Sequence, residues 1–300
     1  MHSTLAISGE NYSERIRCSL HCLCTFDNAR MNVESIIAAF EEWANPEWQE
    51  KWDNCGWQVE PGILKEAAGV LVCLTPTLAV MREAIALKAE GKPVNLIFAH
   101  HPLIFGGISS ITGDGAVGEM VRQAMTHGIG IYSAHTNFDQ VTDGTADVLA
   151  QMLALQNTRP VEPTDEQGRR GYGRVGQLPN ERTIQQLLET IQSELSPQRL
   201  LHSPVNDLQR RVESVAVLGG SGAGYISAVA KTGAQVYLTA DCKFHQFQEA
   251  RDSGIVLVDA GHYATERPAC AQLVGWFEQN GAQWASLSEK DEDFRRFALA

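Results

Sequence analysis

The sequence lacks any long apolar run, and it lacks an excess of basic residues. No stretch approaches the roughly 20 apolar residues that span a bilayer, so we expect no membrane partner. Residues 1–30 contain neither an apolar stretch nor a small-residue cleavage site, which indicates a cytoplasmic protein without an export signal. Lys and Arg number 24 against 36 Asp and Glu. Because affinity for nucleic acid comes largely from basic side chains that displace counterions, nucleic acid is not expected as the main partner.

The chain also lacks the cysteine pattern of a secreted, disulfide-stapled protein. Its seven cysteines are an odd number scattered along the sequence, which favours a reducing compartment. Cys18, His21, Cys22 and Cys24 form a local cluster, and zinc binding is an alternative role for it. Their spacing is not the paired C-x-x-C of structural zinc sites, however. Residues 1–30 show no helix or strand periodicity, so we predict that they form a poorly ordered N-terminal extension.

What the chain does contain is the composition of an ordinary globular protein, with 44% hydrophobic and 20% charged residues. Short apolar runs rich in β-branched residues alternate with segments in which apolar residues recur at helical spacing. The runs predicted as strands are residues 69–74, 94–99, 128–134, 215–218, 235–239 and 255–258, and the main helices are predicted over residues 76–90, 116–127, 145–155, 225–232 and 244–251.

This alternation predicts an α/β protein built from two related β-α-β-α-β halves. Continuous apolar strands separated by helices are typical of mainly parallel sheets that helices cover on both faces. The first half is expected over residues 31–156 and the second over residues 175–300. Between them, residues 157–174 are dense in Pro, Glu, Gly and Arg, which favours a polar linker. Ligands of such sheets gather at the carboxyl ends of the strands, so site residues are expected directly after each strand, between the halves.

Histidines and carboxylates occupy these positions in the sequence. The third strand of each half is followed by the same pattern, His-x-x-x-carboxylate, and two adjacent histidines follow the second strand of the first half. Folding the halves against each other would bring these side chains into one cleft. The residues concerned are His100, His101, His135, Asp139, His245, His262 and Glu266.

Imidazoles and carboxylates together suit Zn, Fe, Mn, Co or Ni. A carboxylate can bridge two ions whereas an imidazole cannot, so the set predicts two neighbouring divalent ions. Glu266 is the expected bridge, in the first turn of a helix where the dipole favours an anion, although Pro268 could equally be there only to start that helix. The alternative is that each histidine merely caps a strand or bonds a backbone carbonyl. The predicted metal ligands are His100, His101, Asp139, His262 and Glu266.

A glycine-rich segment, residues 219–224, follows the first strand of the second half. Backbone amides at such a strand-to-helix turn can cradle an anion such as phosphate. The spacing is not G-x-G-x-x-G, so a tight turn with a packing role is the alternative interpretation. The sequence leaves both open.

Six segments, in order along the chain, resemble a known family. They are DNCGWQVE (53–60), LIFAHHPLIF (96–105), SAHTNFD (133–139), VLGGSG (217–222), YLTADCKFHQ (237–246) and DAGHYATE (259–266). Together they resemble the GTP cyclohydrolase I type 2 homologues, also called NGG-interacting-factor-three-like proteins, in the compact form that lacks an inserted domain.

The resemblance implies a particular distribution of two metal ions. One would be held by His100, Asp139 and Glu266, and the other by His101, His262 and Glu266, with Glu266 as the bridge. The resemblance further implies a toroidal homohexamer and hydrolytic opening of the purine ring of GTP.

Two adjacent divalent ions favour metal-assisted hydrolysis as the reaction class. His135 or His245 would then move protons, because imidazole titrates near neutral pH. A phosphoesterase that acts on nucleotides or other small phosphorylated substrates is an alternative. So is a metal-binding or partner-binding ring without catalytic activity.

Overall fold

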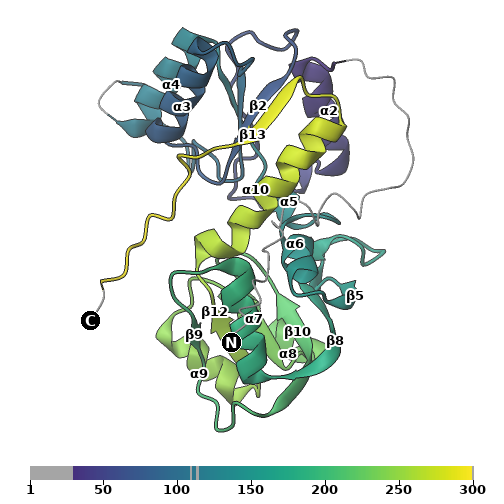
Figure 1. Ribbon diagram of the computed structural model, residues 1–300. Helices are drawn as coiled ribbons and strands as arrows, with labels where there is room; N and C mark the ends of the chain where they lie inside the picture. The colour runs from purple at the N-terminus through teal and green to yellow at the C-terminus, as the bar shows by residue number, and fades with distance from the viewer. Residues whose placement is uncertain (1–29, 109, 113–114, 299–300) are drawn as a thin grey trace, which may run out of the picture.

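The computed structural model describes residues 30–108, 110–112 and 115–298. Nearly all of the predicted N-terminal extension, including its cysteine cluster, lies outside the described residues. The described chain forms two lobes, and each lobe is a sheet covered by helices (Figure 1). The predicted α/β fold class is confirmed. Among the helices of these ranges, none combines the length and the apolar character that a membrane crossing needs.

The first sheet has five strands, four of which are parallel. They are β1 (Gly56–Val59), β2 (Gly69–Cys73), β3 (Leu96–Ala99), β4 (Gly130–Ser133) and β13 (Trp284–Leu287). Their order is β1-β4-β3-β2-β13, and only β1, at the edge, is antiparallel to its neighbour. The central strands are buried on both faces, which explains their continuous apolar sequence.

Four helices cover the two faces of this sheet. They are α2 (Val33–Trp43), α3 (Leu78–Ala89), α4 (Ala116–His127) and α10 (His262–Gln279). Successive strand residues point to opposite faces. Val70 and Val72 therefore belong to the core under α2 and α10, whereas Leu71 belongs to the core under α3 and α4. The arrangement is visible in the upper lobe of Figure 1.

The second sheet has six strands with a parallel centre. They are β5 (Gln156–Arg159), β8 (Arg174–Thr183), β9 (Leu201–His202), β10 (Arg211–Val217), β11 (Val236–Thr239) and β12 (Val256–Asp259). Their order is β5-β8-β10-β11-β12-β9. Only β10, β11 and β12 run parallel, and the outer strands pair antiparallel with their neighbours. This parallel centre corresponds to the predicted second β-α-β-α-β unit.

Helices cover both faces of the second sheet as well. The cores contain Leu149 of α6 and Leu187 of α7 on one face, and Ile226 of α8 and Ala250 of α9 on the other. These helices are α6 (Thr145–Met152), α7 (Ile184–Leu195), α8 (Ile226–Thr232) and α9 (Phe244–Asp252). The remaining elements are α5 (Thr136–Asp139), η1 (Pro46–Trp48), η2 (Ala223–Tyr225), β6 (Glu162–Pro163) and β7 (Gly171–Tyr172).

The division of the chain differs from the prediction in two places. The predicted linker, residues 157–174, contains most of β5, the small β6-β7 pair and the start of β8. Most of its residues before Gly171 are exposed, which explains their polar composition. The second difference is at the C-terminus, where β13 leaves the second lobe and pairs with β2 of the first sheet.

Helix α10 connects the two lobes. It runs from the end of β12 in the second lobe to β13 in the first, as Figure 1 shows in yellow-green. Glu266 is the fifth residue of this helix, so it does not lie in the first turn as predicted. Pro268 lies inside the helix and does not start it. The dipole argument for Glu266 is therefore wrong, and its partners must be found in tertiary contacts.

Candidate metal centre

The site residues come from strand ends of both lobes. His100 and His101 follow β3 directly, and their backbone amides donate to carbonyls at the end of β2. Asp139 closes the short helix α5, which follows β4, and His262 opens α10 just after β12. The parallel strand order places these ends at one edge of each sheet, which is where the chemistry was expected.

Two histidines and one carboxylate oxygen form a close triangle. Oε2 of Glu266 lies 3.0 Å from Nε2 of His101 and 2.8 Å from Nε2 of His262. The two nitrogen atoms are 3.2 Å apart. Three possible metal-binding atoms from the two lobes therefore face one point.

A second group lies around the other oxygen of the same carboxylate. Nε2 of His100 is 3.9 Å from Oε1 of Glu266 and 3.6 Å from Oδ1 of Asp139. The hydroxyl of Thr145 donates to that oxygen of Asp139 at 2.6 Å. Glu266 thus has one oxygen toward each group, and the five residues predicted as ligands are brought together.

Hydrogen bonds to Nδ1 set which ring nitrogen of each histidine faces the cluster. Nδ1 of His100 donates to the carbonyl of Ala134 at 2.8 Å. Nδ1 of His262 donates to Oδ2 of Asp241 at 2.7 Å. In a neutral ring the Nε2 lone pair is then left for a ligand, as in metal sites where an outer partner orients the imidazole.

The pKa values in the cluster are strongly displaced. Burial lowers the pKa of His100 to about 3, so this ring is neutral at neutral pH. Burial also raises the pKa of Asp139 to about 7. Although burial acts in the opposite direction, hydrogen bonds between His262 and its carboxylate partners raise the pKa of that histidine to about 10. Displaced pKa values that gather in one place favour a functional site.

The donor atoms fit a divalent cation. Ligands at right angles about a cation, with bonds of about 2.1 Å, lie about 3.0 Å apart, which is close to the edges of the triangle around Glu266. Nε2 of His100 is buried and has no hydrogen-bond partner among the described residues. Such a buried, unpaired group costs about 1–3 kcal/mol, a cost that coordination of a cation would remove.

His135 lies beside the cluster and is oriented by a carboxylate that the sequence reasoning did not single out. Its Nδ1 donates to Oδ1 of Asp53 at 2.8 Å, and its ring centroid is 5.1 Å from that of His100. Asp53 also accepts hydrogen bonds from the backbone and hydroxyl of Thr136. Burial acts against it, but these bonds lower the pKa of Asp53 and keep it ionised.

His245 is placed differently. It is an exposed residue in the first turn of α9, and among the described residues no hydrogen bond, ion pair or ring contact joins it to the cluster. Lys243, two residues earlier, accompanies it on this exposed surface. Of the two histidines predicted to move protons, only His135 has contacts with the cluster.

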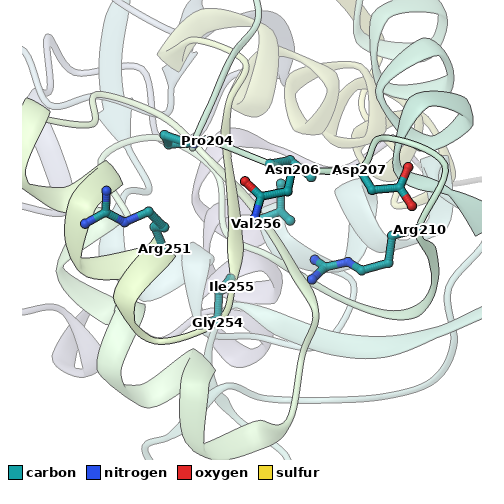
Figure 2. Close-up of a pocket in the computed structure, with 9 residues that line it drawn as sticks. Pro204, Asn206, Asp207, Arg210, Arg251, Gly254, Ile255 and Val256 are labelled. Carbon is teal, nitrogen blue, oxygen red and sulfur yellow. The ribbon is translucent and has the colours of Figure 1, made fainter.

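A separate cavity of about 290 Å³ lies at the opposite end of β12. Figure 2 shows Arg210 and Arg251 on its two sides, with Asn206 between them. Arg251 is paired with Asp252 at 2.7 Å. None of the predicted site residues lines this cavity.

The glycine-rich segment makes room for the cluster. A Cβ atom on Gly220 would lie 1.9 Å from Oε1 of Glu266, so only glycine fits there. The amide of Gly220 donates to the hydroxyl of Thr265, and the amide of Gly222 donates to that of Thr239. Two amides of this turn already have partners, which favours the packing role over a phosphate cradle.

Sequence reasoning missed two carboxylates that orient histidines, Asp53 and Asp241. Asp53 stands in a loop before β1, so the rule that site residues follow strand ends does not select it. Asp241 comes two residues after β11 and satisfies that rule. Both lie within segments that carry the family resemblance, and this was the signal that could have found them.

The fold and the site define a two-lobed α/β protein with a histidine- and carboxylate-rich centre supplied by both lobes. Residues 31–289 match the family described as Duf34/NIF3 (NGG1p interacting factor 3). The chain belongs to this family, and the resemblance drawn from the sequence is confirmed.

Relatives with assigned names agree with this placement. A Nostoc protein named "GTP cyclohydrolase 1 type 2 homolog" is 62% identical over 267 residues, which are 89% of this chain and 99% of the relative. A fission yeast protein, "Protein NIF3 homolog" of Schizosaccharomyces pombe, is 32% identical over 84% of this chain and 93% of its own length.

Solved structures share the fold. A Bacillus cereus protein described as related to NIF3 superimposes with a TM-score of 0.76 at 25% identity, over 90% of this chain and all of that one. The structure described as reduced HcgD from Methanocaldococcus jannaschii has a TM-score of 0.70 at 29% identity, over 86% of this chain and 98% of its own.

Proposed function

We propose that this protein is a dinuclear metal-dependent hydrolase of the GTP cyclohydrolase kind, which opens the purine ring of GTP. The observation that carries the metal part is the triangle of His101, His262 and Glu266 next to the buried Nε2 of His100, which has no hydrogen-bond partner in the described ranges. The substrate part rests on relatives, since the Nostoc and Streptomyces coelicolor proteins are named GTP cyclohydrolase 1 type 2 homologs.

In this proposal each ion has three protein ligands and shares one of them. His100, Asp139 and Glu266 would hold one ion, and His101, His262 and Glu266 would hold the other. Zn, Fe, Mn, Co and Ni all suit this set of imidazoles and carboxylates. Two bound ions would supply Lewis-acid chemistry, lowering the pKa of water and polarising the group under attack.

His135 takes the role of general acid and base in this proposal. Asp53 occupies its Nδ1 and leaves Nε2 free for proton transfer. A ring nitrogen of His135 lies within 4.8 Å of ring nitrogens of His100 and His101, and this closeness to two of the proposed ligands supports the role. The carboxylate holds the ring in one orientation and stabilises its protonated form, as the acid of a catalytic triad does. Within the described part of the chain, His245 makes no contact that supports the same role.

The experiment has two readouts on one sample. Protein purified without chelators is subjected to elemental analysis, and the same sample is incubated with GTP while formate and phosphate release are followed. Two ions per chain and formate release support the proposal. Phosphate release without formate would replace it with the phosphoesterase alternative, although the occupied amides of the glycine turn do not favour that activity.

A protein that holds metal but turns over no nucleotide would be the non-catalytic alternative. Fewer than one ion per chain after reconstitution would contradict the metal centre itself. Metal content and product release are measured separately, so the absence of a metal centre can be distinguished from the absence of catalytic activity.

The toroidal homohexamer that the family resemblance implies is part of the same proposal. Light scattering on the eluting protein tests it directly, because a hexamer has six times the 32.9 kDa mass of one chain. A monomer or dimer at micromolar concentration would contradict it.

A further inference from the structure

We propose that Trp52 and Phe105 bind the planar heteroaromatic ring of the ligand, so that the site takes a nucleobase or a similar ring. This inference rests on the proposed function, because it places the ring next to the metal centre. It adds a binding surface that lies outside the metal ligands.

The two aromatic side chains are largely exposed to solvent. Trp52 is 58% exposed and Phe105 is 62% exposed. The other five tryptophans of the chain are at least partly buried. Large apolar side chains that remain in solvent close to a polar cluster are typical of ligand-binding surfaces.

The rings form a continuous path from the surface to the centre. The centroid of Trp52 lies 5.9 Å from that of Phe105, with an interplanar angle of 61°. The same ring lies 6.0 Å from His135, which in turn lies 5.1 Å from His100. A flat ligand on the indole would thus be next to the histidine assigned to acid–base chemistry.

The surface is built on fixed loops. Trp52 directly precedes Asp53, which is tied to His135 and Thr136. Phe105 directly follows Ile104, whose carbonyl accepts from the side-chain amide of Asn54 at 2.8 Å. The amide of Ile104 also donates to the Gln58 side chain at 3.0 Å. The loops that carry the two rings are therefore hydrogen-bonded to each other.

Fixed, exposed aromatic rings are what recognition of a nucleobase needs. Every base has a π-face, so stacking is tolerant of base identity and gives affinity for the ring as such. Little conformational entropy is lost on binding, because the loops are already held together. This surface therefore selects for ring-containing ligands and leaves the choice among bases to polar groups.

The test measures binding of GTP, ATP, CTP and inorganic tripolyphosphate to the metal-loaded protein by calorimetry. The variants are W52A, F105A and the ring-preserving W52F. F244A is the matched control, because Phe244 is 90% exposed on α9 and, as far as the chain is described, makes no ring contact with the site. Metal content is measured for every variant.

We expect W52A and F105A to weaken binding of the nucleotides by about tenfold or more, as loss of one base-stacking contact does. Tripolyphosphate binding and metal content should stay as in the unmodified protein, and W52F and F244A should bind nucleotides almost normally. An equal loss for tripolyphosphate, or no loss for any nucleotide, would overturn the inference.

Two further outcomes would also overturn it. If W52A or F105A changes the mass measured by light scattering, the rings are a contact between copies of this chain. If the unmodified protein holds two ions but binds none of the nucleotides, the ring surface is refuted while the metal centre stands.

Discussion

Gly220 lies so close to Glu266 that a Cβ atom on the glycine would stand 1.9 Å from the carboxylate oxygen Oε1. The backbone there is left-handed, with a φ of +63°. The glycine-rich turn of the second lobe and the central acid of the site are thus built around each other.

The first prediction is that G220A disrupts the metal centre. The added methyl group would displace the Glu266 carboxylate, so we expect metal content to fall well below that of the unmodified protein. G224A is the control, because a Cβ on Gly224 meets no atom within 4 Å. Elemental analysis measures the effect and thermal unfolding checks the fold. Equal metal content in both variants would refute the role of this contact.

The second prediction concerns the shared carboxylate. E266Q removes the charge that faces both groups of ligands, so we expect loss of both ions. D139N should affect only the ion near His100. E278Q is the control, because Glu278 is exposed further along the same helix. Metal stoichiometry after dialysis separates the cases, and retention of one ion by E266Q would show that this residue is not a bridge.

The third prediction is that D53N slows turnover without removing metal. Asp53 orients His135, and loss of positioned acid–base help costs about 10²- to 10⁴-fold in rate. D252N serves as the control, since Asp252 is exposed and pairs only with its neighbour Arg251 among the described residues. Formate release gives the rate. If D53N turns over GTP as fast as the unmodified protein, His135 is not the acid–base group.

The fourth prediction is a pH dependence of stability in the metal-free protein. The pKa of Asp53 is lowered in the folded protein. Its contribution to the free energy of unfolding is therefore present above pH 3.8, the ordinary pKa of this group, and is lost as the pH falls below that value. Burial lowers the pKa of His135, but the hydrogen bond to Asp53 outweighs burial and raises it. The contribution of His135 to the free energy of unfolding is therefore full below pH 6.5 and is lost as the pH rises through the raised pKa. Denaturation curves should therefore show that D53N lowers the free energy of unfolding most between pH 3.8 and pH 6.5. If D53N lowers the free energy of unfolding by the same amount at every pH, Asp53 and His135 do not form a charged pair.

The fifth prediction concerns a buried ion pair between β8 and α6. Nε of Arg174 donates to Oδ1 of Asp147 at 2.8 Å, and its other nitrogens donate to three backbone carbonyls. R174M leaves a buried carboxylate unpaired, which costs about 3–5 kcal/mol of unfolding free energy. R211M breaks an exposed pair with Glu181 and should cost less than about 1 kcal/mol. Urea denaturation measures the free energy of unfolding of both variants. Similar losses in R174M and R211M would contradict the prediction.

Much of the fold could be predicted because local pattern carries it. The buried central strands, such as Leu96–Ala99, are short apolar runs, and the helices between them repeat apolar residues at helical spacing. The strand-end rule then located the five predicted ligands, since strand direction alone decides which residues follow the carboxyl end. The predicted linker and the C-terminal strand were wrong because edge strands and β13 depend on pairing with distant segments, and the helix start near Glu266 was wrong because Pro268 inside α10 resembles a start signal.

The sequence by itself therefore determined the six central parallel strands β2, β3, β4, β10, β11 and β12, the helices between them and the histidines and acids at the strand ends, because these follow from periodicity and from order along the chain. Only the tertiary structure decided which of these side chains meet. His101 and Glu266 are 165 residues apart in sequence, and Asp53 and His135 are 82 apart. Contacts over such separations depend on how two sheets and the helix between them pack, and no local pattern records that packing.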